Sequence, residues 1–287
     1  MTPLVEPFFD SNTGTFSYVV YNRPGYACAV IDPVLDYDAN IARTGHEMAD
    51  RIIDFVNRKN LQVQWLLETH IHADHLSAST YLREQLGGKI ATSAAVKHVG
   101  EQFDRIFNVD GSKFDPHLYF DHLFEPDEVF DIGDMRTTAM HVPGHTQADM
   151  AFHVENSIVF VGDTLFAPDV GTARCDFPGG SASMLWKSIQ KILELPLSTR
   201  VYLCHDYPPE IRDPRCEFSI SQQKSLNIHL VCHHGEPEFV QFRNARDKAL
   251  RLPELLVPSL QANLRAGALP AAESNGISYI KVPLNTF

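Results

Sequence analysis

Short runs of apolar residues, separated by turn-forming residues, mark most of the first two thirds of the chain. Residues 16–20 and 27–31 predict two strands on either side of an Asn-Arg-Pro-Gly turn. Residues 129–142 predict two strands that meet at a Gly-Asp pair, and residues 150–161 predict a hairpin across Glu-Asn. Further short strands are expected over residues 63–67, 89–92 and 201–204.

Apolar residues at spacings of three and four predict helices between and after these strands. In residues 46–58, Met48, Ile52 and Phe55 would share one side, and a pair of glycines ends the helix expected over residues 77–86. Helices are also expected over residues 96–107, 183–193, 217–229 and 236–250.

This order of elements predicts an α/β (α+β) fold with two sheets and helices outside them. We expect a single domain over residues 1–287. The stretch 252–287, rich in Pro and Leu, is expected as a C-terminal extension packed on that domain.

Charge limits the classes of partner. The 287 residues carry a formal net charge of −12, and no basic patch offsets it. Such a chain repels phosphate backbones, so we expect no nucleic-acid partner.

Cysteine usage and hydropathy bear on the compartment. The five cysteines are odd in number and far apart, which fits a reducing compartment better than a disulfide scaffold. Residues 1–10 lack the basic and apolar regions of a signal peptide, and no apolar run has the ~20 residues that span a bilayer. We therefore expect a cytoplasmic protein with no membrane partner.

A short apolar strand leads directly to a metal-ligand residue type at four places. The residues concerned are His70, His145, Asp163 and His205. Alone, a histidine after Pro-Gly or an aspartate after Gly is usually a turn residue. If the four strands share one sheet edge, however, these side chains converge, and imidazole with carboxylate suits zinc or iron.

The densest occurrence is the segment Thr-His-Ile-His-Ala-Asp-His over residues 69–75. It adds His72, Asp74 and His75 to His70. Asp74 is also a candidate N-cap for the helix that follows. A solvated polar loop would not explain why a strand leads straight into this segment, so we interpret it as a metal-binding motif.

The motif series His-x-His-Ala-Asp-His, Pro-Gly-His, Gly-Asp-Thr and Cys-His-Asp-Tyr, over residues 70–207, resembles the metallo-β-lactamase superfamily. That family implies an αββα four-layer sandwich with the site at one sheet edge. Two branches fit the motifs. One is glyoxalase II, a two-metal thioester hydrolase, and the other is persulfide dioxygenase (sulfur dioxygenase), which has one ferrous iron.

Two segments favour the dioxygenase branch. Residues 171–180 are similar to the Gly-x-x-Arg-x-Asp-Phe segment of persulfide dioxygenases, and the Asn-Leu-Arg-Ala-Gly stretch at 263–267 is similar to the bacterial subgroup. The helical substrate domain of glyoxalase II is not evident. Cys175 departs from the pattern; its role stays open, with a reactive thiol beside Arg174 as one alternative.

The resemblance implies that His70, His145 and Asp163 bind one Fe(II) per chain, with no catalytic residue beyond the metal ligands. The substrates would be glutathione persulfide and O2, and the products sulfite and glutathione. The remaining site residues would surround a second metal position: His72, Asp74, His75 and His205. In the alternative, a binuclear zinc hydrolase of thioesters, those four complete a site for two Zn per chain.

Two further residues are candidates for substrate binding. Arg174 offers a guanidinium that matches carboxylate geometry, although a surface ion pair would also explain it. Tyr207 offers a hydroxyl near His205, although a half-buried aromatic would also explain it. The family makes a homodimer one expectation. A non-enzymatic module that senses metal or sulfur species is the third reading.

Overall fold

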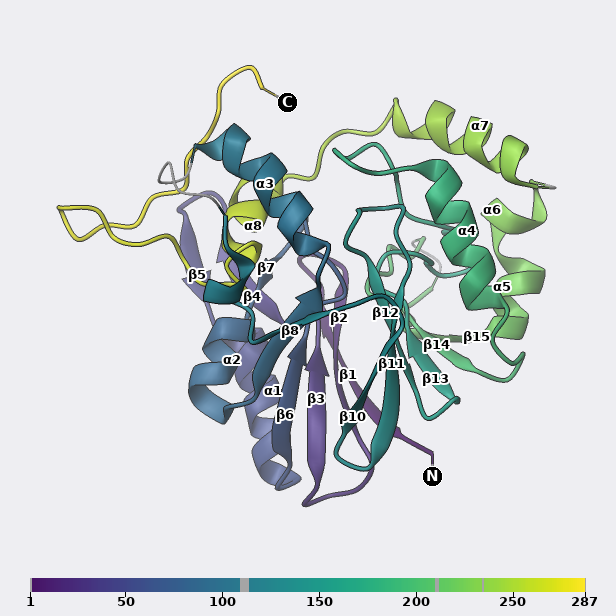
Figure 1. Ribbon diagram of the computed structural model, residues 1–287, viewed down its shortest axis with the longest axis horizontal. Helices are drawn as coiled ribbons and strands as arrows, with labels where there is room; N and C mark the ends of the chain where they lie inside the picture. The colour runs from purple at the N-terminus through teal and green to yellow at the C-terminus, as the bar shows by residue number, and fades with distance from the viewer. Residues whose placement is uncertain (1, 109–113, 210–211, 234, 287) are drawn as a thin grey trace.

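Two six-stranded sheets form the centre of the molecule (Figure 1). The computed structural model describes residues 2–108, 114–209, 212–233 and 235–286. The first sheet has the order β1 (Leu4–Asp10), β2 (Thr15–Tyr21), β3 (Ala27–Ile31), β6 (Gln62–Leu67), β8 (Lys89–Ser93) and β9 (His122–Phe124).

The second sheet is built from the later part of the chain. Its order is β10 (Glu128–Ile132), β11 (Met135–His141), β12 (Met150–Val154), β13 (Ile158–Phe160), β14 (Arg200–Tyr202) and β15 (Glu217–Ser219). A three-stranded sheet, β5 (Arg43–Gly45), β4 (Val34–Asp38) and β7 (Leu76–Ser77), flanks the pair.

Alternation along the strands explains why both faces of the first sheet are buried. In β2, Val19 belongs to the apolar cluster beneath the helices, whereas Tyr18 and Val20 belong to the cluster between the sheets. Successive side chains of a strand point to opposite faces, so one strand contributes to two cores. β3 continues both clusters, since Val19 lies opposite Val30 and Tyr18 opposite Ile31.

Helices cover the outer face of each sheet. The helices on the first sheet are α1 (Glu47–Arg58), α2 (Ser79–Leu86), α3 (Val96–Phe107) and α8 (Leu256–Asn263). Those on the second are α4 (Ala182–Leu193), α5 (Ile220–Leu226), α6 (Ile228–Val231) and α7 (Glu236–Asp247). A short 3-10 helix spans Pro116–Leu118. The predicted αββα sandwich is confirmed.

Two local predictions are wrong. Residues 217–229 do not form one helix: Glu217–Ser219 pairs with β14, and the extended backbone of Asn227 separates α5 from α6. Asp74 does not cap a helix, because β7 intervenes and α2 begins only at Ser79. In both places a tertiary strand pairing overrides the local preference.

The stretch 252–287 is partly interior. Leu256, Leu260 and Ala262 of α8 are buried in the core beneath the first sheet, whereas Leu284 near the chain end is 83% exposed. The single-domain division with a packed extension stays a prediction. Within the described residues, no helix has the length and apolar character needed to cross a membrane.

Candidate metal centre

The strand ends converge, but across two sheets. His70 follows β6 of the first sheet, whereas His145, Asp163 and His205 follow β11, β13 and β14 of the second. The expectation of one shared sheet edge is therefore wrong in detail. The side chains meet where the ends of two packed sheets face each other, which brings residues from four loops into one cluster.

His70, His145 and Asp163 form a compact trio. Their candidate ligand atoms all lie within 4.8 Å of one another, and the three side chains are buried. His145 Nε2 lies 3.7 Å from Asp163 Oδ2. The rings of His70 and His145 are edge-to-face, with centroids 5.2 Å apart.

A second cluster adjoins the trio. His72, Asp74, His75 and His205 also have ligand atoms within 4.8 Å of one another. His205 joins the two clusters, because its Nε2 lies 3.2 Å from Asp74 Oδ2 and 3.4 Å from Asp163 Oδ1. The structure thus brings together all seven residues that were predicted around the metal.

Hydrogen bonds fix which nitrogen of each ring faces the cluster. His145 Nδ1 donates to the Arg174 carbonyl at 2.8 Å. The Thr69 hydroxyl gives its only proton to Asp32, so it accepts from His70 Nδ1 at 3.0 Å. In both rings Nδ1–H is thus directed at a protein oxygen, which leaves Nε2 on the side away from these partners, as metal ligands require.

A chain of hydroxyls does the same for His205. Thr13 donates to Asp10 at 2.6 Å and lies 2.7 Å from the Thr15 hydroxyl. Thr15 therefore donates to Thr13 and accepts from His205 Nδ1 at 3.2 Å. His75 Nδ1 lies 3.4 Å from the same oxygen.

The fit to a cation can be judged from buried atoms without partners. Among the residues that the structure describes, five buried atoms in the two clusters have no hydrogen-bond partner: His70 Nε2, His72 Nδ1, His75 Nε2, His205 Nε2 and Asp163 Oδ1. Unpaired polar atoms at this depth are costly unless a metal satisfies them. Their number and chemistry fit a divalent transition metal.

Burial also controls the charge of the trio. Desolvation lowers the pKa of His70 well below its ordinary value, and His72 adds to the effect. Desolvation, with the nearby Asp74 carboxylate, raises the pKa of Asp163 well above its ordinary value. A bound cation would stabilise the ionised carboxylate of Asp163, which burial disfavours. Metal binding would therefore release a proton from this residue.

Sequence reasoning missed two buried carboxylates behind His72. Its Nε2 lies 3.1 Å from Asp32 Oδ1 and 3.4 Å from Glu68 Oε2. Asp32 follows directly on β3, so the strand-end pattern that marked the other residues was available to find it. Glu68 precedes the motif and accepts from Ser79 Oγ at 2.5 Å, which no local pattern indicated.

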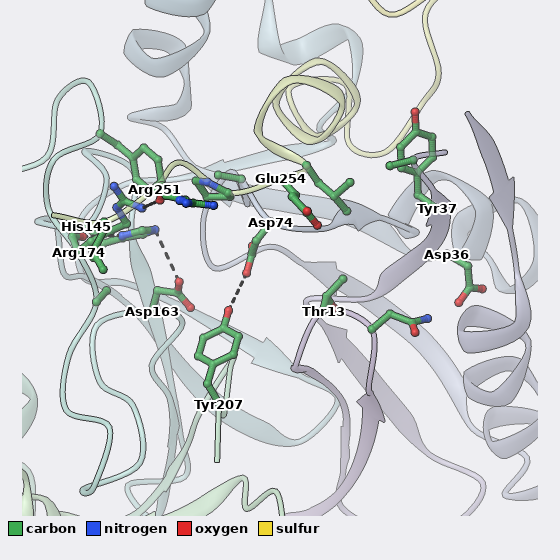
Figure 2. Close-up of a pocket in the computed structure, with 18 of the residues that line it drawn as sticks. Thr13, Asp36, Tyr37, Asp74, His145, Asp163, Arg174, Tyr207, Arg251 and Glu254 are labelled. Atoms are coloured by element: carbon green, nitrogen blue, oxygen red, sulfur yellow. Dashed lines mark hydrogen bonds and ion pairs between the residues drawn. The ribbon is translucent and has the colours of Figure 1, made fainter. Parts of the chain in front are cut away.

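A cavity of about 1130 Å³ opens onto the trio, with His145, Asp163 and Asp74 in its lining. Arg174 lines it too, but its guanidinium pairs with Asp176 at 2.6 Å. Tyr207 donates to Asp74 Oδ2 at 3.1 Å. Figure 2 shows this hydroxyl directed at Asp74 and the His145–Asp163 contact beside it. Substrate binding by Arg174 and Tyr207 stays a prediction.

Cys175 contributes no reactive thiolate. Its side chain is buried, and desolvation raises the pKa of the thiol despite the neighbouring Arg243. Nucleophilic cysteines require the opposite shift.

The family follows from this fold and site. The family profile of the metallo-beta-lactamase superfamily matches residues 12–205, which contain both clusters. The chain belongs to that superfamily.

Several relatives extend over nearly the whole chain. Glyoxylase B2 of Dictyostelium discoideum is 44% identical, covering 98% of this chain and 97% of the relative. A probable metallo-hydrolase of Burkholderia pseudomallei is also 44% identical, covering 98% and 99%. The mitochondrial persulfide dioxygenase ETHE1 of Bos taurus is 27% identical, covering 92% and 89%.

Among solved structures, ETHE1 from Myxococcus xanthus superposes with a TM-score of 0.72 at 25% identity. The match covers 92% of this chain and 100% of that one. The predicted resemblance to the superfamily, with persulfide dioxygenase and glyoxalase-type relatives, is confirmed. The relatives divide between hydrolase and dioxygenase names, so the reaction is not decided by them.

Proposed function

We propose that this protein is a non-haem iron persulfide dioxygenase, in which His70, His145 and Asp163 hold one Fe(II). The observation that carries the proposal is the buried trio, with His70 Nε2 and Asp163 Oδ1 lacking hydrogen-bond partners among the described residues. Two imidazoles and one carboxylate on a single face are the donor set of non-haem iron oxygenases. The similarity to ETHE1, a persulfide dioxygenase, supports the same reaction.

The single-metal proposal gives the second cluster a supporting role. Its His205 Nε2 lies 3.4 Å from Asp163 Oδ1 of the trio and 3.2 Å from Asp74 Oδ2, which accepts a hydrogen bond from Tyr207. Residues of this cluster would then orient the trio rather than bind a second ion.

The reaction would convert glutathione persulfide, O2 and water into glutathione and sulfite. The outer sulfur gains three oxygen atoms, two from O2 and one from water, and the sulfur–sulfur bond breaks. When bound, Fe(II) would supply the redox chemistry and the positions for persulfide and O2. The protein would fix the His145 ring through the Arg174 carbonyl and keep Asp163 and His70 in a buried environment.

The cavity offers charges for an anionic substrate. Arg246 and Arg251 line it although the whole chain is acidic, and so does Arg174, which would exchange its contact with Asp176 for one with the substrate. Guanidinium groups match carboxylate geometry, and glutathione persulfide carries two carboxylates. Tyr37 and Asp36 lie across the cavity from Arg174 and His145 (Figure 2), where a cationic amino group would be received.

The second candidate is a two-zinc hydrolase of glutathione thioesters. It is favoured by the completeness of the second cluster and by the 44% identity to a probable metallo-hydrolase. In that reading His72, Asp74, His75 and His205 are ligands rather than supporting groups. When bound, the two zinc ions would supply the activation of water for hydrolysis.

Metal analysis combined with two assays separates the candidates. Protein purified without oxygen should hold one iron per chain, and Fe(II)-loaded protein should consume O2 and form sulfite in equal amounts from glutathione persulfide. His145→Ala should abolish both, whereas His122→Ala, whose ring pairs with Glu128 outside the clusters, should leave both unchanged. Two zinc ions per chain, rapid thioester cleavage and no O2 uptake would instead establish the hydrolase.

A further inference from the structure

Helix α8 lies far from residues 69–75 in the sequence, but it contacts the loop that carries this histidine-rich motif. α8 ends at Asn263, beyond residues 12–205 that match the family profile. The Asn263 side chain is only 3% exposed. Its Nδ2 donates to the carbonyls of His72 at 2.9 Å and His75 at 2.8 Å, and its Oδ1 accepts from Ser77 N at 2.7 Å.

These three bonds use both amide protons and the carbonyl oxygen of one side chain. Each backbone partner belongs to residues 72–77, the segment that also provides Asp74. Buried carbonyls and amides outside regular ladders need partners, so this amide determines how the segment can fold. A single planar group that bridges the carbonyls of His72 and His75 fixes the distance between them.

The contact extends past Asn263. Thr80 donates to the Ala266 carbonyl through its backbone nitrogen at 3.0 Å and its hydroxyl at 2.8 Å. Gly267 has a φ of +84°, and a Cβ there would lie 2.1 Å from the Ser77 carbonyl oxygen. Residues 263–267 therefore lie directly against residues 77–80, with backbone in close approach to backbone.

We propose that Asn263 is a positioning residue of the metal centre. It holds residues 72–77 in the conformation that presents His72, Asp74 and His75 to the clusters. The inference rests on the proposed metal site: with one iron, Asn263 positions groups that support the trio, and with two zinc ions it positions ligands themselves. It also gives the buried helix α8 a role at the metal centre.

The same helix provides a matched control. Gln261 is 2% exposed, and its amide also bridges three backbone groups. Its Nε2 donates to Val257 O at 3.0 Å and Lys281 O at 2.9 Å, and its Oε1 accepts from Lys281 N at 3.0 Å. These partners lie in α8 and the chain end, not in the metal-binding loop. The two side chains thus differ in what they hold rather than in their chemistry.

The test measures metal affinity without any assay of turnover. Wild type, Asn263→Ala and Gln261→Ala are prepared metal-free and titrated with Zn(II) and Co(II) against a chelating indicator, and the Co(II) absorption spectrum is recorded. Loss of a group that orients metal ligands weakens binding by about 10–100-fold. We expect that loss, with an altered Co(II) spectrum, in Asn263→Ala, and an affinity within about twofold of wild type in Gln261→Ala.

Two results would overturn the inference. One is an Asn263→Ala affinity equal to that of wild type, and the other is an equal loss in both variants, which would indicate general damage to α8. Failure of wild type itself to bind metal would instead remove the proposed function. If Asn263→Ala does not fold, hydrogen exchange on metal-free wild type decides. The Ser77 amide, which donates to Asn263 Oδ1, should be protected from exchange. Fast exchange there would contradict the proposal that Asn263 holds residues 72–77.

Discussion

His70, His145 and His205 each have Nδ1 held by a protein oxygen, and that contact determines which ring nitrogen faces the clusters. For His205 the oxygen is the Thr15 hydroxyl, whose own proton is directed to Thr13 and so towards Asp10. The arrangement leaves His205 Nε2 as an acceptor beside Asp74 and Asp163. A residue outside every metal-ligand motif therefore determines what one of the motif residues can do.

Thr15→Val tests this arrangement. Valine keeps the shape but removes the acceptor for His205 Nδ1–H, so the ring can rotate or change tautomer. We expect metal affinity to fall by roughly 10-fold or more, measured by chelator competition. Thr137→Val is the control, since Thr137 is equally buried and its hydroxyl donates to the Met135 carbonyl rather than to a residue of the clusters. Equal affinities for Thr15→Val and wild type would contradict the assignment.

His229 is a buried histidine outside the metal clusters. It accepts from Thr172 N at 2.9 Å, and burial, followed by the nearby Arg243 and Arg246, lowers its pKa to about 3. An unfolded histidine has a pKa of about 6.5. The unfolded state therefore binds the proton more readily, and the stabilisation, complete above pH 6.5, is lost as the pH falls towards 3.

Urea unfolding of metal-free protein at pH 7.5 and 5.0 measures this effect. From the 1.5 pH units between 6.5 and 5.0, His229 accounts for about 2 kcal/mol of the decrease in unfolding free energy. The decrease should be smaller by about that amount in His229→Gln, which has no titrating ring. Parallel losses in wild type and variant would show that the ring is not held neutral.

At the scale of elements, the amphipathic helices and the strands flanked by turns were predictable because their pattern is local. The helix over residues 46–58 and the strand over 27–31 match α1 and β3 closely. The β-structure of Glu217–Ser219 was not predictable, since it depends on pairing with β14. The role of α8 was not predictable from the sequence either, because its contact with residues 72–77 joins segments about 190 positions apart.

The candidate ligands were predictable for a related reason. His70, His145, Asp163 and His205 each follow the end of a strand, and the sequence pattern indicates that position. The pattern does not indicate which sheet each strand joins, so the site lies between two sheets rather than at the single edge that was expected. The supporting groups Thr15, Asp32 and Glu68 are linked to the site only through space.

Gly144→Ala probes the element that supports His145. The loop before His145 lies against α4, where Ser181 N donates to the Gly144 carbonyl and Ser188 Oγ to the Pro143 carbonyl. Gly144 has a φ of +151°, and a Cβ there would lie 2.3 Å from Leu185 Cα. We expect a loss of roughly 1–3 kcal/mol in unfolding free energy and weaker metal binding, measured by urea titration and chelator competition. Retention of both properties would show that α4 can shift without cost.

At the scale of the whole molecule, the two halves of the sandwich meet at the site. The first sheet provides His70 and the second provides His145 and Asp163, so a bound ion adds a link between sheets that also contact through apolar side chains and hydrogen bonds such as Trp65 Nε1 to the Asp131 carbonyl. Burial and the Asp74 carboxylate both raise the pKa of Asp163, and a bound cation would favour its ionised form. Metal binding should therefore stabilise the entire fold rather than one loop.

Metal at 100 times its dissociation constant should add about 2.7 kcal/mol to the unfolding free energy, because the ion binds the folded chain and the unfolded chain lacks the assembled site. Denaturant titration with and without Fe(II) or Zn(II) measures the gain. His70→Ala combined with His145→Ala should abolish it, whereas His98→Ala, on the exposed side of α3, should retain it. If the double variant keeps the full gain, the ion does not join the sheets through this trio. If the metal increases only the exchange protection of nearby amides and not the free energy of unfolding, the bound ion does not stabilise the contact between the two sheets.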